Sequence, residues 1–262
     1  MRILITNDDG ISAPGLAVLK DIADEVAGPD GHVTTVAPAF EQSGVGHAIT
    51  YTRPMSIYQH GPDTWACDGS PADCVLAGIH EILGGTLPDL ILSGVNRGNN
   101  SAENSLYSGT LGAAIEGALQ GVPSIALSQY YGPRNRDLEN TFDASAVHGA
   151  DVVRRILAVL PKEDPDSYRL FFNVNIPPVP AADVQGVRVT PQGMRPGVGF
   201  HTEPLTAPSG KPFLWITGGN QQVPTAPGTD AAVNLEGYIS VTPMRADLTD
   251  HAALAALSGI NT

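Results

Sequence analysis

The sequence predicts an α/β fold, in which a Rossmann-like, doubly wound and mostly parallel sheet is followed by a C-terminal extension of β-hairpins or an extended arm. Over roughly residues 1–178, short apolar runs alternate with helical patterns. Such alternation requires right-handed crossovers, which produce a parallel sheet with helices on both faces. From 177 to 228, prolines and glycines become dense and helical patterns disappear. We therefore expect an α/β region over 1–178 and an extension over 179–262, within one domain.

The first strand and the first helix have the clearest signals. Ile3–Thr6 is a short apolar run that ends in a polar loop, as a buried parallel strand does. Ser12 and Pro14 then open a helix, because a proline fits the first helical turn. Apolar residues recur on one face of this helix at Leu16, Leu19, Ile22, Ala23 and Val26.

The same alternation continues along the α/β region. Pro71 falls in the first turn of the next expected helix, and the helix that begins near residue 109 is rich in small residues. The patterns predict strands over 32–38, 88–96, 123–128 and 168–177, and helices over 71–83, 109–121 and 144–160.

The extension has a different texture. Short strands are expected at 187–190, 197–201 and 213–217, then a strand over 237–243 and a closing helix over 248–257. A long irregular segment in a compact chain is usually functional or forms an interface. We therefore favour a role in subunit contact, and a mobile surface flap is the alternative.

Composition excludes several classes of partner. The 262 residues carry a formal charge of −13 and contain no cluster of Lys and Arg, which argues against a long nucleic acid partner. No apolar run reaches 18 residues, and the N-terminus does not resemble a signal peptide. Cys67 and Cys74 do not form a CxxC pair, so we expect reduced thiols in a cytoplasmic protein.

Oxygen-bearing side chains follow three of the expected strands. In open α/β sheets ligands bind beyond the carboxyl ends of the strands. The first strand leads to Asp8 and Asp9, the second to a loop that contains Ser43, and the strand over 88–96 ends in Ser93 and Asn96. Carboxylate, hydroxyl and amide oxygens suit Mg²⁺ or Mn²⁺ rather than zinc. The alternative for Asp8 and Asp9 is a turn that caps the first helix.

A candidate anion site lies at the start of the helix over 109–121. Ser108, Gly109 and Thr110 stand where free backbone N–H groups and the helix dipole attract an oxyanion. The alternative is that Ser108 or Thr110 only caps the helix. A metal site and a phosphate-sized site at one sheet edge predict metal-assisted hydrolysis of a phosphate ester, in which Asp8 or Asp9 positions or deprotonates a water molecule.

Several other site types lack their signatures. The chain contains no GxGxxG, GxxxxGK[ST] or GxSxG motif, so neither a dinucleotide site, a P-loop nor an α/β-hydrolase elbow is expected. His47 and Asp68 could line the pocket. An incidental loop histidine and a simple turn are the alternatives.

At these residues the chain resembles the SurE family of stationary-phase survival nucleotidases. The matching stretches are ILITNDDGISAPG, VAPAFEQSGVGHAIT, CDGSPADCV, PDLILSGVNRGNN, YSGTLGAAIEG, FNVNIP and EGYISVTPMRADLT, which cover nearly the whole chain in order. Ser70 stands where family members often carry Thr, and the loop before Ser108 is polar where many members carry a more glycine-rich one.

The resemblance implies hydrolysis of nucleoside monophosphates, and in some members of short polyphosphate, with one divalent cation per subunit. It also implies assembly into a homodimer or homotetramer through the C-terminal hairpin extension. The implied metal ligands are Asp8, Asp9, Ser43 and Asn96, and the implied phosphate-binding residues are Asn100, Ser108, Gly109 and Thr110.

Three other interpretations of the site differ from a nucleotidase in the residues they require. A receiver-like signalling module needs a later phosphorylatable Asp and a Lys at a strand end, yet Lys20, Lys162 and Lys211 are not at strand ends. An aspartyl-phosphate phosphatase requires a DxD pattern, whereas this chain has DD. A nucleotide-binding module without turnover remains open.

Overall fold

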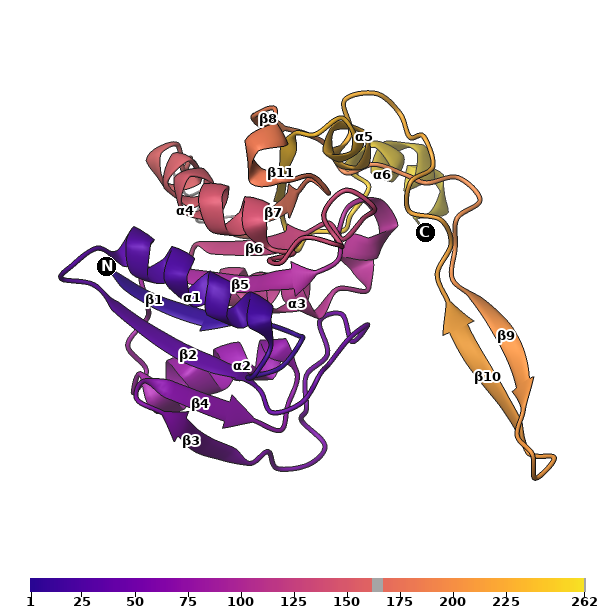
Figure 1. Cartoon of the computed structure of the whole chain (residues 1–262). Helices are drawn as coiled ribbons and strands as arrows, with labels where there is room; N and C mark the ends of the chain where they lie inside the picture. Colours follow the sequence, from indigo (N-terminus) through magenta and orange to yellow (C-terminus); the bar gives the residue numbers. More distant parts are fainter. Residues whose placement is uncertain (162–166, 262) are drawn as a thin grey trace.

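A computed structural model describes residues 1–161 and 167–261 of the chain. The central sheet is mostly parallel, with strand order β3-β4-β2-β1-β5-β6-β7-β11-β8 (Figure 1). Only the β3–β4 and β7–β11 pairs are antiparallel among the described pairs of this sheet. The strands are β1 (Arg2–Thr6), β2 (His32–Pro38), β3 (Ile57–Gly61), β4 (Thr64–Cys67), β5 (Leu90–Arg97), β6 (Ser124–Gln129), β7 (Phe171–Ile176), β8 (Val187–Val189) and β11 (Ile239–Met244).

Helices cover both faces of the sheet, which confirms the predicted doubly wound α/β class. The helices are α1 (Pro14–Ala27), α2 (Pro71–Ala77), α3 (Gly109–Leu119), α4 (Asp143–Ala158), α5 (Asp230–Leu235) and α6 (His251–Leu257). On one face α1 and α4 share an apolar core with side chains such as Ile5 and Leu92. On the other face α2 and α3 pack on Leu4 and Ile91.

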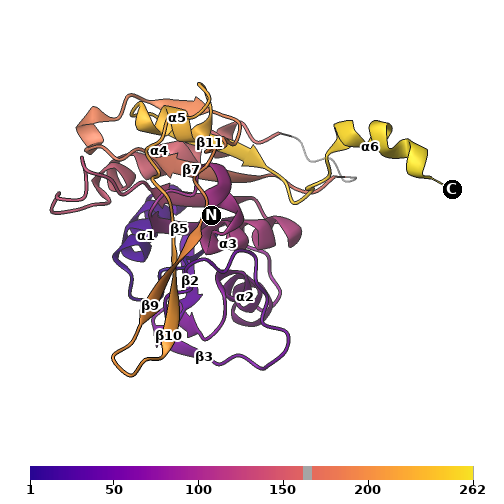
Figure 2. The same cartoon turned by 90° about the vertical axis from the view of Figure 1, so that its right-hand side faces the viewer.

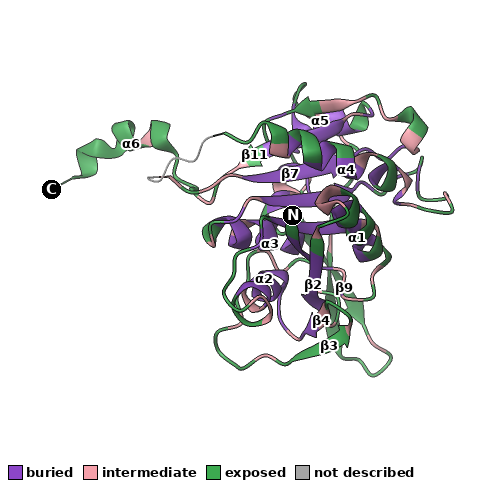
Figure 3. Ribbon diagram, turned by 90° about the vertical axis from the view of Figure 1, so that its left-hand side faces the viewer, coloured by how far each residue is buried: buried purple, intermediate pink, exposed green. Residues whose placement is uncertain are grey.

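The alternation of neighbouring side chains explains the continuous apolar runs. Leu4 and Ile5 are adjacent in β1, and both are fully buried, but they enter opposite cores because successive side chains of a strand point to opposite faces. Burial is concentrated in this sheet and its covering helices (Figure 3). A strand buried on both faces therefore has no polar alternation, as its sequence indicates.

A second sheet lies outside this core. β9 (His201–Thr206) and β10 (Pro212–Thr217) form an antiparallel hairpin that projects from the body (Figures 1 and 2). The C-terminal helix α6 also extends away from the body (Figure 2). Among the described residues, no helix is both long enough and apolar enough to cross a membrane.

Most predicted elements are present, and the differences have local causes. The expected strand at 197–201 is wrong, because β9 begins at His201, where its pairing with Thr217 of β10 starts. The helix predicted over 71–83 is α2 continued by a π-helical turn at Gly78–Ile82. The β3–β4 hairpin and α5 had no counterpart in the sequence prediction. Ala13 rather than Ser12 is the N-cap of α1, with no side-chain cap bond.

The extension joins the body through its two remaining strands. β11 pairs antiparallel with β7, and β8 pairs parallel with β11. The helix α5 packs against β11. The main sheet thus contains strands from both sides of residue 178, and β9 and β10 are the only described strands outside it.

Candidate active site

The carboxyl ends of β1, β2 and β5 meet at one cavity of about 230 Å³. Parallel strands place their carboxyl ends at the same sheet edge, which is where α/β proteins bind ligands. The predicted site residues that line this cavity are Asp8, Asp9, Ser43, Asn96, Asn100 and Ser108. Its other lining residues are Glu41, Gly44, Arg97, Asn104, Tyr107 and Phe200.

Asp8 is held rigidly between β1 and α3. The Thr110 hydroxyl donates to Oδ1 of Asp8 at 2.7 Å, and the Thr110 backbone N–H donates to Oδ2 at 3.2 Å. The backbone carbonyl of Asp8 accepts from the N–H of Gln42 at 2.7 Å, which ties the loop after β2 to the same point. Each carboxylate oxygen has further lone pairs, so both remain able to bind a ligand in the cavity.

Asp9 is less enclosed and less constrained. Its Oδ2 accepts from the backbone N–H of Arg97 at 3.2 Å, at the end of β5. The side chain is half-buried, whereas that of Asp8 is buried. The two adjacent carboxylates therefore reach the cavity from one loop with different freedom.

Ser43 and Asn96 bring neutral oxygens to the cavity. The Ser43 hydroxyl donates to Oε1 of Glu41 at 2.7 Å, so its oxygen keeps lone pairs that can accept from or coordinate another group. The Asn96 amide nitrogen donates to the carbonyl of Gly98 at 3.0 Å, so the amide oxygen is the atom that could bind a cation. The register of β5 against β6 shifts between Ser93 and Asn96, and this irregularity sets the direction of Asn96.

Burial raises the pKa of both carboxyl groups. The pKa of Asp8 rises to about 6, mainly through loss of solvation, and the hydrogen bond from the Thr110 hydroxyl opposes part of that rise. Loss of solvation also raises the pKa of Asp9, and the Arg97 N–H opposes it. Two poorly solvated neighbouring carboxylates are costly to ionise, and a divalent cation would remove that cost.

The donor set fits a hard divalent cation. Within residues 1–161 and 167–261, no group of three or more His, Cys, Asp or Glu side chains is arranged to hold a metal. A metal at this edge would instead be held by two carboxylates together with a hydroxyl and an amide oxygen. That all-oxygen set suits Mg²⁺ or Mn²⁺ and lacks the nitrogen and sulfur ligands typical of zinc.

The N-terminus of α3 abuts Asp8. A Cβ on Gly109 would lie 2.9 Å from the Cβ of Asp8 and 3.2 Å from its Oδ2, so only glycine permits this approach. Ser108 caps the helix, with its hydroxyl oxygen accepting from the N–H of Leu111 at 3.1 Å. Gly109 and Thr110 are not among the cavity-lining residues, and Thr110 is fully buried with its hydroxyl committed to Asp8.

The start of α3 still offers donors to an anion. Of its first three N–H groups, that of Thr110 serves Asp8 and that of Leu111 serves Ser108. Among the described residues this leaves the N–H of Gly109 and the hydroxyl hydrogen of Ser108. Both donors are next to the carboxylate pair, at the positive end of the helix dipole.

Asn100 connects the cavity to a buried polar network. Its amide nitrogen donates to Oγ of Ser128 at 2.8 Å and makes a longer 3.4 Å contact with Oγ1 of Thr110. Its backbone N–H donates to the side chain of Asn175 at 2.7 Å, and Asn173 donates to its carbonyl at 2.8 Å. The loop after β5 is thus fixed to β6 and β7 by fully buried side chains.

Arg195, which no sequence pattern marked as a site residue, binds the same loop from the extension. Its buried guanidinium donates to Oδ1 of Asn99 at 2.9 Å, and to the carbonyl and hydroxyl of Ser101 at 2.9 and 2.6 Å. Asp230, fully buried, accepts from the backbone N–H groups of Ala102 and Gly193. The extension therefore holds the loop that leads to Ser108.

Two sequence candidates lie elsewhere. Nε2 of His47 is 2.8 Å from Oε2 of Glu116, so this pair connects the loop after β2 to α3. Asp68 pairs with Arg53 at 3.0 Å on the surface. Neither lines the cavity. The sequence had indicated the loops that contain Glu41, Asn104 and Tyr107. Phe200 falls in the strand wrongly expected over 197–201, and no sequence pattern had placed it at the cavity.

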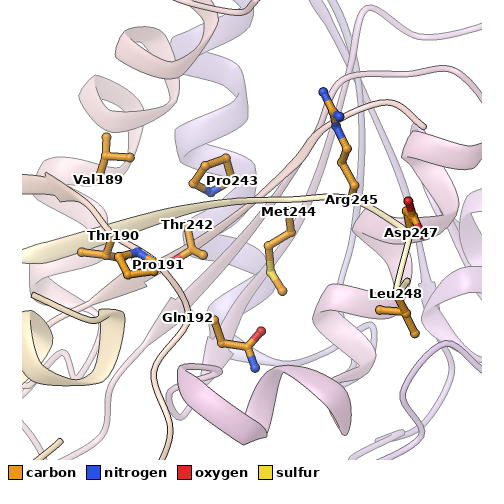
Figure 4. Close-up of a pocket in the computed structure, with 10 residues that line it drawn as sticks. All are labelled: Val189, Thr190, Pro191, Gln192, Thr242, Pro243, Met244, Arg245, Asp247 and Leu248. Atoms are coloured by element: carbon orange, nitrogen blue, oxygen red, sulfur yellow. Dashed lines mark hydrogen bonds between the residues drawn. The ribbon is translucent and has the colours of Figure 1, made fainter. Parts of the chain in front are cut away.

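A larger hollow of about 540 Å³ does not carry this chemistry. It lies along the ends of β8 and β11, next to the segment that leads to α6 (Figure 4). Its lining includes Met244, Leu248 and one carboxylate, Asp247, but none of the predicted site residues. The candidate site is therefore identified by the oxygen-bearing side chains that line the smaller cavity, and not by cavity volume.

Comparisons with known proteins place this chain in a family. The family model described as Survival protein SurE matches residues 3–197. A "5'-nucleotidase SurE" of Roseobacter denitrificans is 68% identical over 100% of both chains, and one of Ruegeria pomeroyi is 65% identical over 98% of both. A crystal structure of a SurE protein from Aquifex aeolicus superposes with a TM-score of 0.78 at 36% identity, covering 98% of each chain.

Proposed function

The chain belongs to the SurE family, and from that premise we propose that it is a divalent-metal-dependent phosphoric monoester hydrolase that converts nucleoside monophosphates to nucleosides and phosphate. Relatives named as 5'-nucleotidases over the full chain support the reaction class. The observation in the structure that supports it best is that Asp8, packed against the N-terminus of α3, and the adjacent Asp9 line one cavity.

Asp8, Asp9, Ser43 and Asn96 would hold one Mg²⁺ or Mn²⁺. When bound, such a cation polarises a phosphoryl oxygen and lowers the pKa of a water molecule. Asp8 is immobilised by Thr110, so its contribution is a fixed charge. Asp9 makes one backbone hydrogen bond and is half-buried, which suits it to orient the attacking water and take its proton.

The phosphate would lie against the start of α3. The N–H of Gly109 and the hydroxyl of Ser108 donate to its oxygens, and the helix dipole favours its charge. Asn100 supports this subsite, because only one of its amide hydrogens is firmly engaged, with Ser128 at 2.8 Å. Thr110 acts as a positioning residue through Asp8. A terminal phosphate of short polyphosphate would present the same group, so it is a second substrate to test.

We further propose that the protein forms a homodimer or homotetramer through the β9–β10 hairpin and acts in the cytoplasm. An isolated two-stranded hairpin is marginal in water. This one exposes Leu214, Trp215 and Ile216 at 67%, 64% and 71%, which favours burial against a second copy. Cys67 and Cys74 are both free and buried, in keeping with reduced thiols.

The test is phosphate release from nucleoside 5′- and 3′-monophosphates and short polyphosphate, each with EDTA, Mg²⁺ or Mn²⁺. We expect release that requires a metal and is abolished by EDTA. Release that persists in EDTA would contradict metal dependence. No release with any substrate or metal, from protein shown to be folded by circular dichroism, would favour a nucleotide-binding module without turnover.

A further inference from the structure

Two exposed aromatic rings stand at the mouth of the active-site cavity. Tyr107 is 48% exposed and Phe200 is 50% exposed, and both line the cavity that contains Asp8 and Ser108. Their ring centroids are 4.9 Å apart at an interplanar angle of 80°. They come from opposite parts of the chain, one directly before the N-cap of α3 and the other directly before β9.

The edge-to-face geometry leaves aromatic surface available. In such a pair the edge of one ring covers one face of the other, so further ring faces stay uncovered. The cavity is otherwise lined mainly by polar and charged side chains. An apolar, flat ligand group beside the phosphate subsite would therefore find its only large aromatic partners, among the described lining residues, in Tyr107 and Phe200.

The rings are held in place by contacts between the two chain segments. A Cβ on Gly218 would lie 3.3 Å from Cε1 of Phe200, so the ring rests close to the backbone at the end of β10. Asn104 donates to Oε1 of Gln221 at 2.9 Å and to the carbonyl of Asn99 at 3.2 Å. Both amide hydrogens of Asn104 are thereby engaged, and its amide oxygen remains as an acceptor in the cavity.

We propose that Tyr107 and Phe200 form the platform on which the substrate's nucleobase stacks, and that the Asn104 amide oxygen accepts a hydrogen bond from the bound nucleoside. This rests on the proposed nucleotidase function and adds the element that distinguishes a nucleotide from other phosphate esters. Tyr107 is adjacent in sequence to Ser108, so the platform and the phosphate donors are carried by one loop. Because every base has a π face, the platform accepts all bases and favours purines, whose stacking area is larger.

The experiment compares Tyr107→Ala and Phe200→Ala with the unaltered protein. The substrates are guanosine 5′-monophosphate, uridine 5′-monophosphate and ribose 5-phosphate, which has no base. Stacking of the base stabilises the bound substrate and the transition state equally. Its loss should therefore raise KM and leave kcat within about twofold. We expect KM for guanosine 5′-monophosphate to rise about tenfold or more in each variant, KM for uridine 5′-monophosphate to rise less, and KM for ribose 5-phosphate to stay within about twofold.

Three variants serve as controls. Tyr107→Phe and Phe200→Tyr keep the ring and should restore KM to within about threefold of the original value. Tyr131→Ala removes a tyrosine that is equally exposed, at 45%, but lies outside the cavity lining, and should change no parameter. Equal losses on ribose 5-phosphate would overturn the proposal, because they would show that the rings only support the phosphate subsite. Unchanged KM values for all three substrates would overturn it as well.

A binding measurement separates this proposal from the reaction itself. Calorimetric titration of guanosine, which has a base and no scissile phosphate, should show affinity about tenfold weaker in each alanine variant than in the unaltered protein. If no phosphate ester is hydrolysed but the alanine variants bind guanosine more weakly, the proposed hydrolase function is wrong and the stacking platform is supported. If phosphate esters are hydrolysed and guanosine binds all forms equally, the platform fails and the function holds.

Discussion

The carboxyl edge of the sheet and the β9–β10 hairpin differ in how far one chain buries and hydrogen-bonds their side chains. At the sheet edge, Asp8 is 5% exposed and both of its oxygens accept bonds from Thr110. On the hairpin, Trp215 and Ile216 are 64% and 71% exposed and belong to none of the three apolar cores of the described chain. The first region is complete within one chain, whereas the second has apolar surface that one chain does not bury.

This difference supports the proposal that the sheet edge carries the chemistry and the hairpin carries the assembly. A catalytic site must hold its groups before the substrate arrives, and the buried, hydrogen-bonded carboxylate of Asp8 meets that condition. An exposed apolar hairpin is costly in water unless another surface covers it. Two residues of the extension connect these regions: Phe200 lines the cavity, and Arg195 bonds the loop that leads to it.

The largest expected effect is at the sheet edge. Asp8→Asn removes the charge that would hold the metal but keeps the side-chain volume, so we expect kcat/KM to fall by roughly 10³-fold or more. Asp9→Asn should fall comparably. The measurement is phosphate release at saturating Mn²⁺, with circular dichroism to confirm the fold. Lys20→Gln, which removes an exposed partner of Asp24, is the control and should retain full activity. Activity near the original value in either Asn variant would remove that carboxylate from the proposed metal site.

The second effect tests the clamp that joins the two regions. Arg195→Met removes a buried guanidinium together with its three hydrogen bonds to Asn99 and Ser101, whose oxygens then keep only the bonds made within their own loop. This loss should lower the free energy of unfolding by about 3–5 kcal/mol. Urea unfolding measures it. Arg155→Met, which breaks an exposed pair with Asp151, is the matched control and should cost under about 1 kcal/mol. Equal losses in the two variants would mean that the clamp contributes no more than a surface ion pair.

The third effect tests the close approach of α3 to Asp8. In Gly109→Ala the new Cβ must displace Asp8 or the helix, because it would lie 2.9 Å from the Cβ of Asp8. We expect a loss of about 1–3 kcal/mol in unfolding free energy, together with a reduced kcat. Gly259→Ala, with no heavy atom within 4 Å of its new Cβ, is the control. Full activity in Gly109→Ala would show that the positions of Asp8 and α3 are independent.

The sequence predicted the sheet edge far better than the connection to the extension. The edge is encoded locally, because an apolar strand, a polar loop and a capped helix each have short-range signals, as at Ile3–Thr6 and Ser108. The contact between Arg195 and Asn99 spans 96 residues, and no local pattern marks it. Phe200 likewise enters the cavity only through the path of the extension. Sequence patterns identify what each strand carries to its end, but not which distant residues close the cavity.

Substitutions in the hairpin should have the smallest effect on the fold, and they test most directly whether the hairpin differs from the sheet edge in needing a second copy. Side chains alternate between the two faces of β10, so Leu214 and Ile216 share one face and Phe213 and Trp215 share the other. We expect the double variant Leu214→Asn with Ile216→Asn, or Phe213→Asn with Trp215→Asn, to convert an oligomer into smaller species by light scattering. The face whose variant does so is the one that a second copy covers. Because these side chains are exposed in one chain, the unfolding free energy of the body should change by less than about 0.5 kcal/mol. A monomeric unaltered protein, or two variants with unchanged mass, would instead assign the hairpin to the surface-flap alternative and leave the sheet-edge site complete without it.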